Sequence, residues 1–225
     1  MLTVTLVIVI LTCIISVPAF GNPKLIDDLI FYPPAVANQN QWYRFFTCGF
    51  IHADAAHLIF NMFALYSFGA AVENGQVYSD GIRSSGFIPI FGLGMGKFYY
   101  GLMYVSALFF CLLPTYAKHK NNYSYRSLGA SGAVSAVIFA GLLLEPRTGV
   151  GLLFIPVHIP GYIFGPLYLI ISTYLAKKGR GNINHSAHIW GALYGMIFIV
   201  AAAWIFARYH VLEMFIERIR MDIGF

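Results

Sequence analysis

The stretch RSLGASGAVSAVIFAGLLL, which runs from Arg126 to Leu144, places Gly-Ala-Ser-Gly at the start of an otherwise apolar run. After its first arginine the stretch carries no charge, and it is about long enough for a helix to cross a bilayer core, which takes ~20 residues. Ser131 then has two interpretations. It is either a small residue that lets membrane helices pack closely, or a nucleophile held just below a membrane surface.

The whole chain has the composition of a membrane protein. Of its 225 residues, 59% are hydrophobic and only 10% are charged, whereas a soluble domain carries about 25% charged residues. The alternating short strands of a membrane β-barrel are absent from the sequence, so an all-α membrane protein is predicted. Six apolar runs predict a six-transmembrane-helix bundle, with helices at about residues 2–20, 52–72, 98–116, 129–144, 158–176 and 187–207. These form one domain, residues 1–207, followed by a short tail, residues 208–225.

The remaining composition excludes several classes of protein. Six spans leave no room for a soluble catalytic domain, so any chemistry must lie within the bundle. The first run lacks the basic segment of a signal peptide, and we interpret it as a retained helix. Cys13, Cys48 and Cys111 are too few and too scattered for a disulfide framework or a metal cluster. The net charge of +5 suits contact with anionic lipid, but no basic stripe with interleaved aromatic residues suggests a nucleic-acid partner.

Polar residues gather at the N-terminal ends of the second, fourth and sixth predicted helices. Because consecutive spans alternate in direction, these three ends lie on the same side of the membrane. They carry His57 and Asn61, Ser131, and His188, each within the first two or three turns of its helix. At ~1.5 Å rise per residue, all four lie in the same outer third of one leaflet. Taken singly, Ser131 and the His57–Asn61 pair are more simply explained as packing or hydrogen bonding between helices, and His188 fits either a structural or a functional role equally well. Their coincidence at one depth indicates a site.

Glycines explain how these helices could approach closely enough for chemistry. A serine hydroxyl and an imidazole must come within ~3 Å to share a proton, and small residues at the contact allow this. Two glycines flank Ser131, and two more form a Gly-x-x-x-Gly step after His188. The four predicted packing positions are Gly129, Gly132, Gly191 and Gly195.

A metal or haem centre is an alternative site, because four histidines occur near these helix ends. They are His52, His57, His185 and His188. Asp54 is the single carboxylate near them, and no His-Glu-x-x-His motif is present. A proton pathway is a second alternative, but pumps normally add carboxylates within the membrane. The sequence therefore predicts neither a metal nor a cofactor.

Three motifs together resemble the rhomboid intramembrane serine proteases: HADAAHLIFN (His52–Asn61), GASG (Gly129–Gly132) and AHIWG (Ala187–Gly191). The resemblance covers about residues 42–207 and implies a six-helix core with a partly embedded first loop. It implies Ser131 as nucleophile and His188 as general base and then acid, with His52 as an accessory residue at the mouth. The groups implied to stabilise the oxyanion belong to His57, Asn61, Ser131 and Gly129.

By the same resemblance, the substrates are transmembrane segments of other membrane proteins, met within the lipid. It places the protein in a bacterial inner membrane with the site facing outward, although a weak excess of Lys and Arg on the motif side, eight against six, favours the opposite orientation. The main alternative is a rhomboid-like protein that binds membrane segments without cutting them. No oligomeric state is predicted.

The sequence departs from the family pattern in two places. Tyr43 separates Trp42 from Arg44, where the family usually has the two residues adjacent. Ser135 stands four residues after Ser131, where many bacterial members have an aromatic residue that stacks on the catalytic histidine. The sequence thus gives no group that orients the imidazole of His188.

Overall fold

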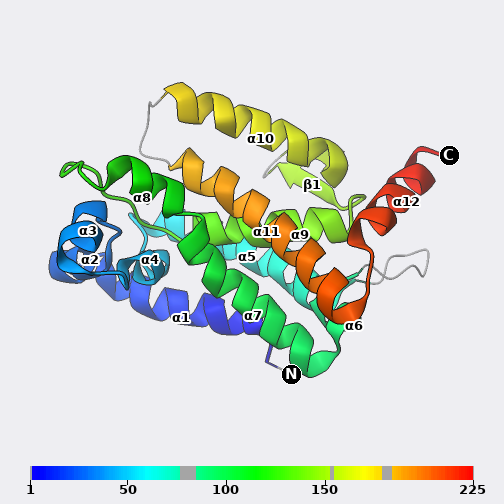
Figure 1. Cartoon of the computed structure of the whole chain (residues 1–225), viewed down its shortest axis with the longest axis horizontal. Helices are drawn as coiled ribbons and strands as arrows, with labels where there is room; N and C mark the ends of the chain where they lie inside the picture. Colours follow the sequence, from blue (N-terminus) through cyan, green and yellow to red (C-terminus); the bar gives the residue numbers. More distant parts are fainter. Residues whose placement is uncertain (1, 77–84, 153–154, 179–183, 225) are drawn as a thin grey trace.

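The computed structural model describes residues 2–76, 85–152, 155–178 and 184–224, and these are mostly helical (Figure 1). The long helices are α1 (Val4–Ala19), α5 (Ala55–Asn74), α7 (Leu93–Phe110), α9 (Ser131–Leu144), α10 (Gly161–Lys178) and α11 (His185–Ala207). Shorter helices are α2 (Pro23–Leu29), α3 (Pro33–Gln39), α4 (Arg44–Thr47), the 3-10 turn η1 (Cys48–Phe50), α6 (Phe87–Phe91), α8 (Leu113–His119) and α12 (Val211–Ile223).

Helix α9 forms the centre of the bundle. It packs against α11, α5 and α7, and Figure 1 shows it in the middle of the molecule with α10 at the edge. Most of its side chains are buried, and many of them are Gly, Ala or Ser. Small side chains let the neighbouring backbones approach closely, which places the start of α9 in direct contact with the start of α11.

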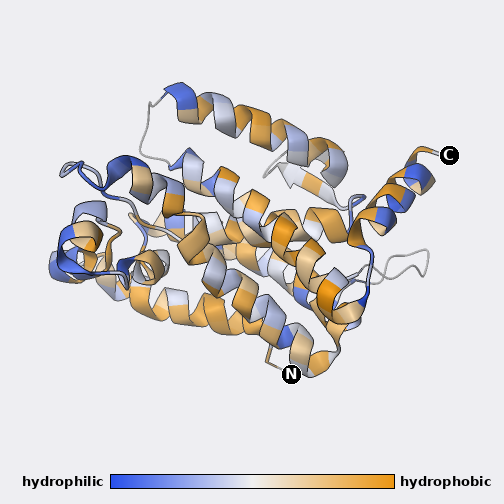
Figure 2. Cartoon of the chain, viewed as in Figure 1, coloured by the Kyte–Doolittle hydropathy of each residue, from blue (hydrophilic) through white to orange (hydrophobic). Residues whose placement is uncertain are grey.

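The long helices are largely hydrophobic along their lengths (Figure 2), and many of their exposed side chains are apolar, as expected for a protein surrounded by lipid. On α5, for example, Ile59, Phe60 and Phe63 are each more than half exposed. In the described part of the chain, three segments are long and apolar enough to cross a membrane: α5, residues 93–119, and α11. Helices α1 and α9 are apolar but shorter. This is a helical membrane protein in which three of the six expected spans meet both criteria.

The prediction of an all-α chain was wrong at one place. Residues Gly149–Leu152 (β1) and Ile155–Pro160 (β2) pair as an antiparallel hairpin, with Gly149 opposite Pro160. An apolar run free of charge fits a short strand as well as a helix, and glycine, proline and β-branched residues here favour the strand. Helix α10 therefore begins at Gly161, directly after Pro160, and not at residue 158.

Other helix ends shift by a few residues for local reasons. Helix α5 begins at Ala55 because the Asp54 carboxylate caps it, accepting a 2.7 Å bond from the His57 N–H. His52 thus lies before the helix and not in it. The third predicted helix begins earlier, at Leu93, and its α-helical hydrogen bonding is interrupted after Phe110, close to Pro114. A proline removes a backbone donor and crowds the preceding turn, which explains the break.

The segment between α1 and α5 is a compact set of short helices held by Arg44. The buried guanidinium donates to the carbonyl oxygens of Asp27 and Ile30, each at 2.7 Å, and to Gln41 at 2.5 Å. Trp42 stacks on Phe45 with ring centroids 5.8 Å apart. The inserted Tyr43 therefore leaves both family-like residues with well-defined partners. The embedding of this loop in the membrane stays a prediction.

Buried charges anchor the end of the bundle that lies opposite the start of α9. The Glu73 carboxylate accepts bonds from the N–H groups of Val4 and Thr5, at 2.8 and 2.9 Å, and so caps α1. An anion is favourable at a helix N-terminus, where backbone donors point outward. Glu73 is fully buried, so it ties the end of α5 to the start of α1.

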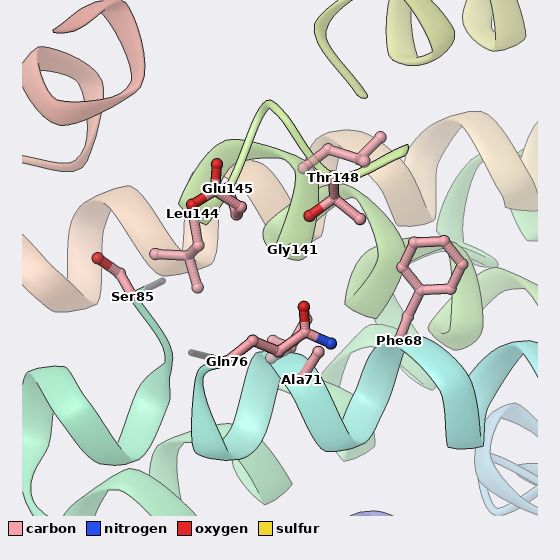
Figure 3. A pocket seen from close by; sticks show the side chains of 10 residues that line it. Phe68, Ala71, Gln76, Ser85, Gly141, Leu144, Glu145 and Thr148 are labelled. Atoms are coloured by element: carbon pink, nitrogen blue, oxygen red, sulfur yellow. The ribbon is translucent and has the colours of Figure 1, made fainter. Parts of the chain in front are cut away.

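The tail is an ordered helix, α12, that docks at this same end. Its Arg218 is buried, forms an ion pair with Glu145, and donates to the Leu144 carbonyl at 2.7 Å. Beside these contacts, between the ends of α5 and α9, lies a pocket of about 30 Å³, with Phe68, Gln76 and Glu145 around it (Figure 3). A volume of this size holds a water or two and no substrate.

Candidate active site

The starts of α9 and α11 touch through backbone at two glycines. A Cβ at Gly191 would overlap the carbonyl oxygen of Gly132, and a Cβ at Gly195 would overlap that of Ala136. A Cβ at Gly132 would lie 2.5 Å from the Cys111 sulfur. At Gly191 and Gly195 the atoms in the way are backbone of α9, so these two glycines set how closely the two helices approach.

This close approach brings Ser131 and His188 together. Ser131 is the first residue of α9 and His188 lies in the first turn of α11. The Ser131 Oγ and the His188 Nε2 are 2.6 Å apart. For Nε2 to accept the serine proton, the ring must carry its own proton on Nδ1. The pair has the geometry of a hydroxyl hydrogen-bonded to a general base.

A glycine turn lifts Ser131 to the start of its helix. Gly129 has a φ of +111°, which L side chains rarely adopt, and its N–H donates to the Cys48 carbonyl at 2.9 Å. The His57 ring packs directly against it, since a Cβ at Gly129 would lie 2.7 Å from the His57 Cε1. The structure thus places the imidazole of His57 beside the turn that carries the serine.

Asn61 lies one turn further along α5. Its side-chain N–H donates to the His57 carbonyl at 2.9 Å, and the residue is buried. This contact directs the amide toward its own helix backbone, whereas the sequence expects it to point at the oxyanion. A role for Asn61 at an oxyanion stays a prediction and requires this side chain to rotate.

His52 is not at a mouth, because it is fully buried behind the glycine turn. Its Nε2 accepts the Ala130 N–H at 3.4 Å, and its Nδ1 lies 3.2 Å from the Ser16 hydroxyl on α1. Its ring meets that of His57 edge-on, with centroids 4.9 Å apart. Burial, reinforced by the neighbouring His57, lowers the pKa of His52 to about 4. His52 therefore supports the turn as a neutral group.

A residue that sequence reasoning missed contacts the other side of the His188 ring. The Tyr168 hydroxyl on α10 lies 3.3 Å from the His188 Nδ1. Ser135, the small residue four positions after Ser131, donates to the Ser131 carbonyl at 2.8 Å and adjoins the Tyr168 hydroxyl. In the sequence Tyr168 is one of several tyrosines in an apolar run, so no pattern singles it out.

A cavity of about 20 Å³ lies next to Ser131 and has room for one water molecule. It is bounded by the start of α9, by Cys48 and Cys111, and by Asn184 and Ala187 at the start of α11. Among the described residues, no group of three His, Cys, Asp or Glu side chains gathers as a metal would require. His185 has its ring 6.0 Å from that of His188.

The chain also matches a known protein family. A model of the Rhomboid domain matches residues 39–205, which include the glycine turn and both members of the serine–histidine pair. The chain belongs to the rhomboid family. Rhomboids are typically intramembrane serine proteases, although some rhomboid-like members are inactive.

Two curated relatives of this rhomboid come from Arabidopsis thaliana. "RHOMBOID-like protein 12, mitochondrial" is 31% identical over 170 residues, which cover 70% of this chain and 44% of the relative. "Rhomboid-like protein 11, chloroplastic" is 27% identical over 178 residues, covering 75% and 54%. The rhomboid chain thus spans about half the length of the curated relatives it matches. The names of these relatives refer to mitochondria and chloroplasts, so they lend no support to the expected bacterial inner membrane.

Proposed function

We propose that this rhomboid is a serine endopeptidase that cuts transmembrane segments of other membrane proteins. Ser131 is the nucleophile and His188 the general base. The observation that carries this proposal is the 2.6 Å contact between the Ser131 Oγ and the His188 Nε2. Family membership supports it, because rhomboids are typically proteases of this kind.

The proposed reaction has two steps, acylation of the serine and hydrolysis of the acyl-serine. The Ser131 hydroxyl gives its proton to the His188 Nε2 while its oxygen attacks the scissile carbonyl carbon. The tetrahedral intermediate collapses to an acyl-serine, and the imidazolium returns its proton to the leaving amine. A water molecule then loses a proton to the same nitrogen while its oxygen attacks the ester carbonyl carbon, and the imidazolium returns that proton to the Ser131 oxygen as the carboxylic acid product leaves. Hydrolysis needs only one water at a time, and the cavity beside Ser131 has room for one.

The oxyanion is stabilised by groups at the start of α9. This helix begins at Ser131 with no side-chain cap, so its first N–H groups and its dipole favour a developing negative charge. The imidazole of His57, which packs against Gly129, is a second donor beside the serine, whereas the Gly129 N–H is bonded to the Cys48 carbonyl and is not counted among the oxyanion donors. Asn61 adds a donor when its amide leaves the His57 carbonyl.

We extend the proposal to the membrane arrangement. Helices α1, α9 and α10 complete six spans with the three that are long and apolar enough alone. Exposed apolar side chains support this for α1, with Leu11, Ile14 and Val17, and for α10, with Ile163 and Ile170. The serine–histidine pair opens to the outer face, and the loop between α1 and α5 lies at the interface.

The test is labelling of purified protein by a fluorophosphonate, which reacts with activated serines. We expect wild type to label and both Ser131→Ala and His188→Ala to lose labelling. Ser124→Ala, in an exposed loop, is the control and should label like wild type. Folded wild type that takes no probe, in detergent that supports labelling of an active rhomboid, would overturn the proposal and favour a non-proteolytic membrane-segment-binding protein.

A further inference from the structure

A catalytic histidine that has no carboxylate partner still needs a group that fixes the orientation of its ring. In a serine–histidine pair, the imidazole must present a bare Nε2 to the serine, so its proton must stay on Nδ1. A group that accepts a hydrogen bond from Nδ1 fixes this tautomer and stabilises the positive charge that develops. Within the part of the chain that the structure describes, the partner of the His188 Nδ1 is the Tyr168 hydroxyl, at 3.3 Å.

The position of Tyr168 is itself well fixed. Its ring packs between Phe139 of α9 and Phe164 of α10, with centroid distances of 5.5 and 5.8 Å. Two serine hydroxyls, those of Ser135 and Ser172, adjoin its own hydroxyl. Ser172 lies four residues after Tyr168 on the same face of α10 and is buried.

One assignment of protons satisfies the whole cluster. The Ser135 hydroxyl donates to the Ser131 carbonyl at 2.8 Å, so its oxygen remains free to accept from Tyr168. Tyr168 then accepts the Nδ1–H of His188, which leaves its own proton to point toward the neighbouring Ser135 hydroxyl. His188 in turn accepts the Ser131 hydroxyl at Nε2. The chain of bonds starts and ends on Ser131, and the hydroxyls of Tyr168 and Ser135 each both donate and accept.

We propose that Tyr168 is a positioning residue that holds His188 in its catalytic tautomer and stabilises the imidazolium. This inference rests on the proposed function of the serine–histidine pair. Ser135 completes the arrangement, because its small side chain leaves space for the tyrosine and its hydroxyl oxygen is available as an acceptor beside the phenol. The orienting group therefore comes from α10, a different helix from those that carry Ser131 and His188.

The experiment compares Tyr168→Phe with wild type in the full-length protein. The phenylalanine keeps the ring contacts and removes the oxygen. Tyr174→Phe on the same helix is the matched control, because Tyr174 is 57% exposed. We measure the second-order rate of fluorophosphonate labelling across pH, and the ¹⁵N NMR shifts of the His188 ring, assigned by comparison with His188→Ala.

We expect Tyr168→Phe to label about 10- to 100-fold more slowly, as befits loss of one hydrogen bond to a charged group. The pH range over which the labelling rate rises should also differ between Tyr168→Phe and wild type, because the imidazolium of His188 has lost a hydrogen-bond partner in the variant. The ¹⁵N shifts should report protonation at Nδ1 in wild type and a mixture of ring tautomers in the variant. Tyr174→Phe should match wild type in every measurement.

Unchanged rate and unchanged ¹⁵N shifts in Tyr168→Phe would overturn this inference alone. If Tyr168→Phe fails to fold, 4-fluorophenylalanine at position 168 fills the space of the hydroxyl with a very weak acceptor. Slow labelling of that folded variant supports the inference, and labelling at the wild-type rate overturns it. Absence of labelling in folded wild type would instead overturn the proposed function, which makes the two failures distinguishable.

Discussion

Gly129 carries two constraints that only glycine satisfies. Its φ of +111° is unfavourable for any side chain, and the His57 ring occupies the space where a Cβ would lie. The residue joins the buried support of the turn, through the Cys48 carbonyl, to the serine two positions later. The geometry of the candidate nucleophile therefore depends on a residue that does no chemistry through a side chain.

We expect Gly129→Ala to lower the free energy of unfolding by about 1–3 kcal/mol and to reduce fluorophosphonate labelling by at least about tenfold. Thermal denaturation in detergent and labelling rates measure the two effects. Gly94→Ala is the control, because nothing lies within 4 Å of a Cβ there. If Gly129→Ala labels at the wild-type rate, the turn does not position Ser131 as described.

His52 makes stability depend on pH in a defined direction. Burial lowers its pKa from 6.5 to about 4, reinforced by His57 and opposed by the nearby Asp54. Between these values the unfolded chain holds more protons than the folded one. The free energy of unfolding should therefore fall as the pH falls from about 6.5 to about 4.

The measurement is the melting temperature across that range for wild type and His52→Gln. Glutamine keeps an acceptor for the Ala130 N–H and does not titrate. We expect the variant to show a shallower loss of stability on acidification, with other histidines contributing equally to both proteins. An identical dependence in the two proteins would contradict a neutral, buried His52.

At the scale of the elements, the contact between α9 and α11 determines whether Ser131 and His188 meet. Gly191 and Gly195 lie against backbone carbonyl groups of α9, and backbone cannot yield as a side chain can. We expect Gly191→Ala to push the helices apart, destabilise the protein by about 1–3 kcal/mol and reduce labelling by more than about tenfold. Labelling rates and melting temperatures test this.

Gly101→Ala on α7 is the matched control, because its Cβ would make only an ordinary 3.5 Å contact with Val4. It should be neutral or slightly stabilising, since alanine favours helix more than glycine does. Should Gly191→Ala behave like Gly101→Ala, the close approach of the two helices would not be needed for the site.

The sequence predicted some of these features and missed others, and each outcome has a physical reason. Ser131, His57 and His188 were placed at one depth because charge-free runs and alternating spans fix the ends of helices. The β1–β2 hairpin was missed because a charge-free apolar run does not by itself distinguish strand from helix. Tyr168 was missed because its role depends on how α10 packs on α11, which no local pattern encodes. Burial of His52 depends in the same way on a distant contact with Ser16.

At the scale of the whole molecule, α12 is fastened to the core opposite the serine–histidine pair. Arg218 bridges the last carbonyl of α9 and the Glu145 carboxylate, and Glu145 also accepts a bond from Arg147 at 3.1 Å. We expect Arg218→Met to lower the free energy of unfolding by about 1–3 kcal/mol, less than for a fully unpaired charge because Arg147 remains.

A double-mutant cycle with Glu145→Gln measures this interaction, and Arg220→Met, at an exposed position of α12, is the control. The combined loss should be smaller than the sum of the single losses, because each single change removes the same contact. Additive losses would show that the two groups do not interact.

The measurement that most directly tests the central claim is the site of the fluorophosphonate adduct, found by mass spectrometry of peptides from the labelled, full-length protein. The account predicts one adduct on Ser131 in wild type, at least about 100-fold less in His188→Ala, and an undiminished adduct in Ser124→Ala. An adduct on another serine, or equal modification of Ser131 without His188, would contradict the claim that these two residues form a nucleophile and its base.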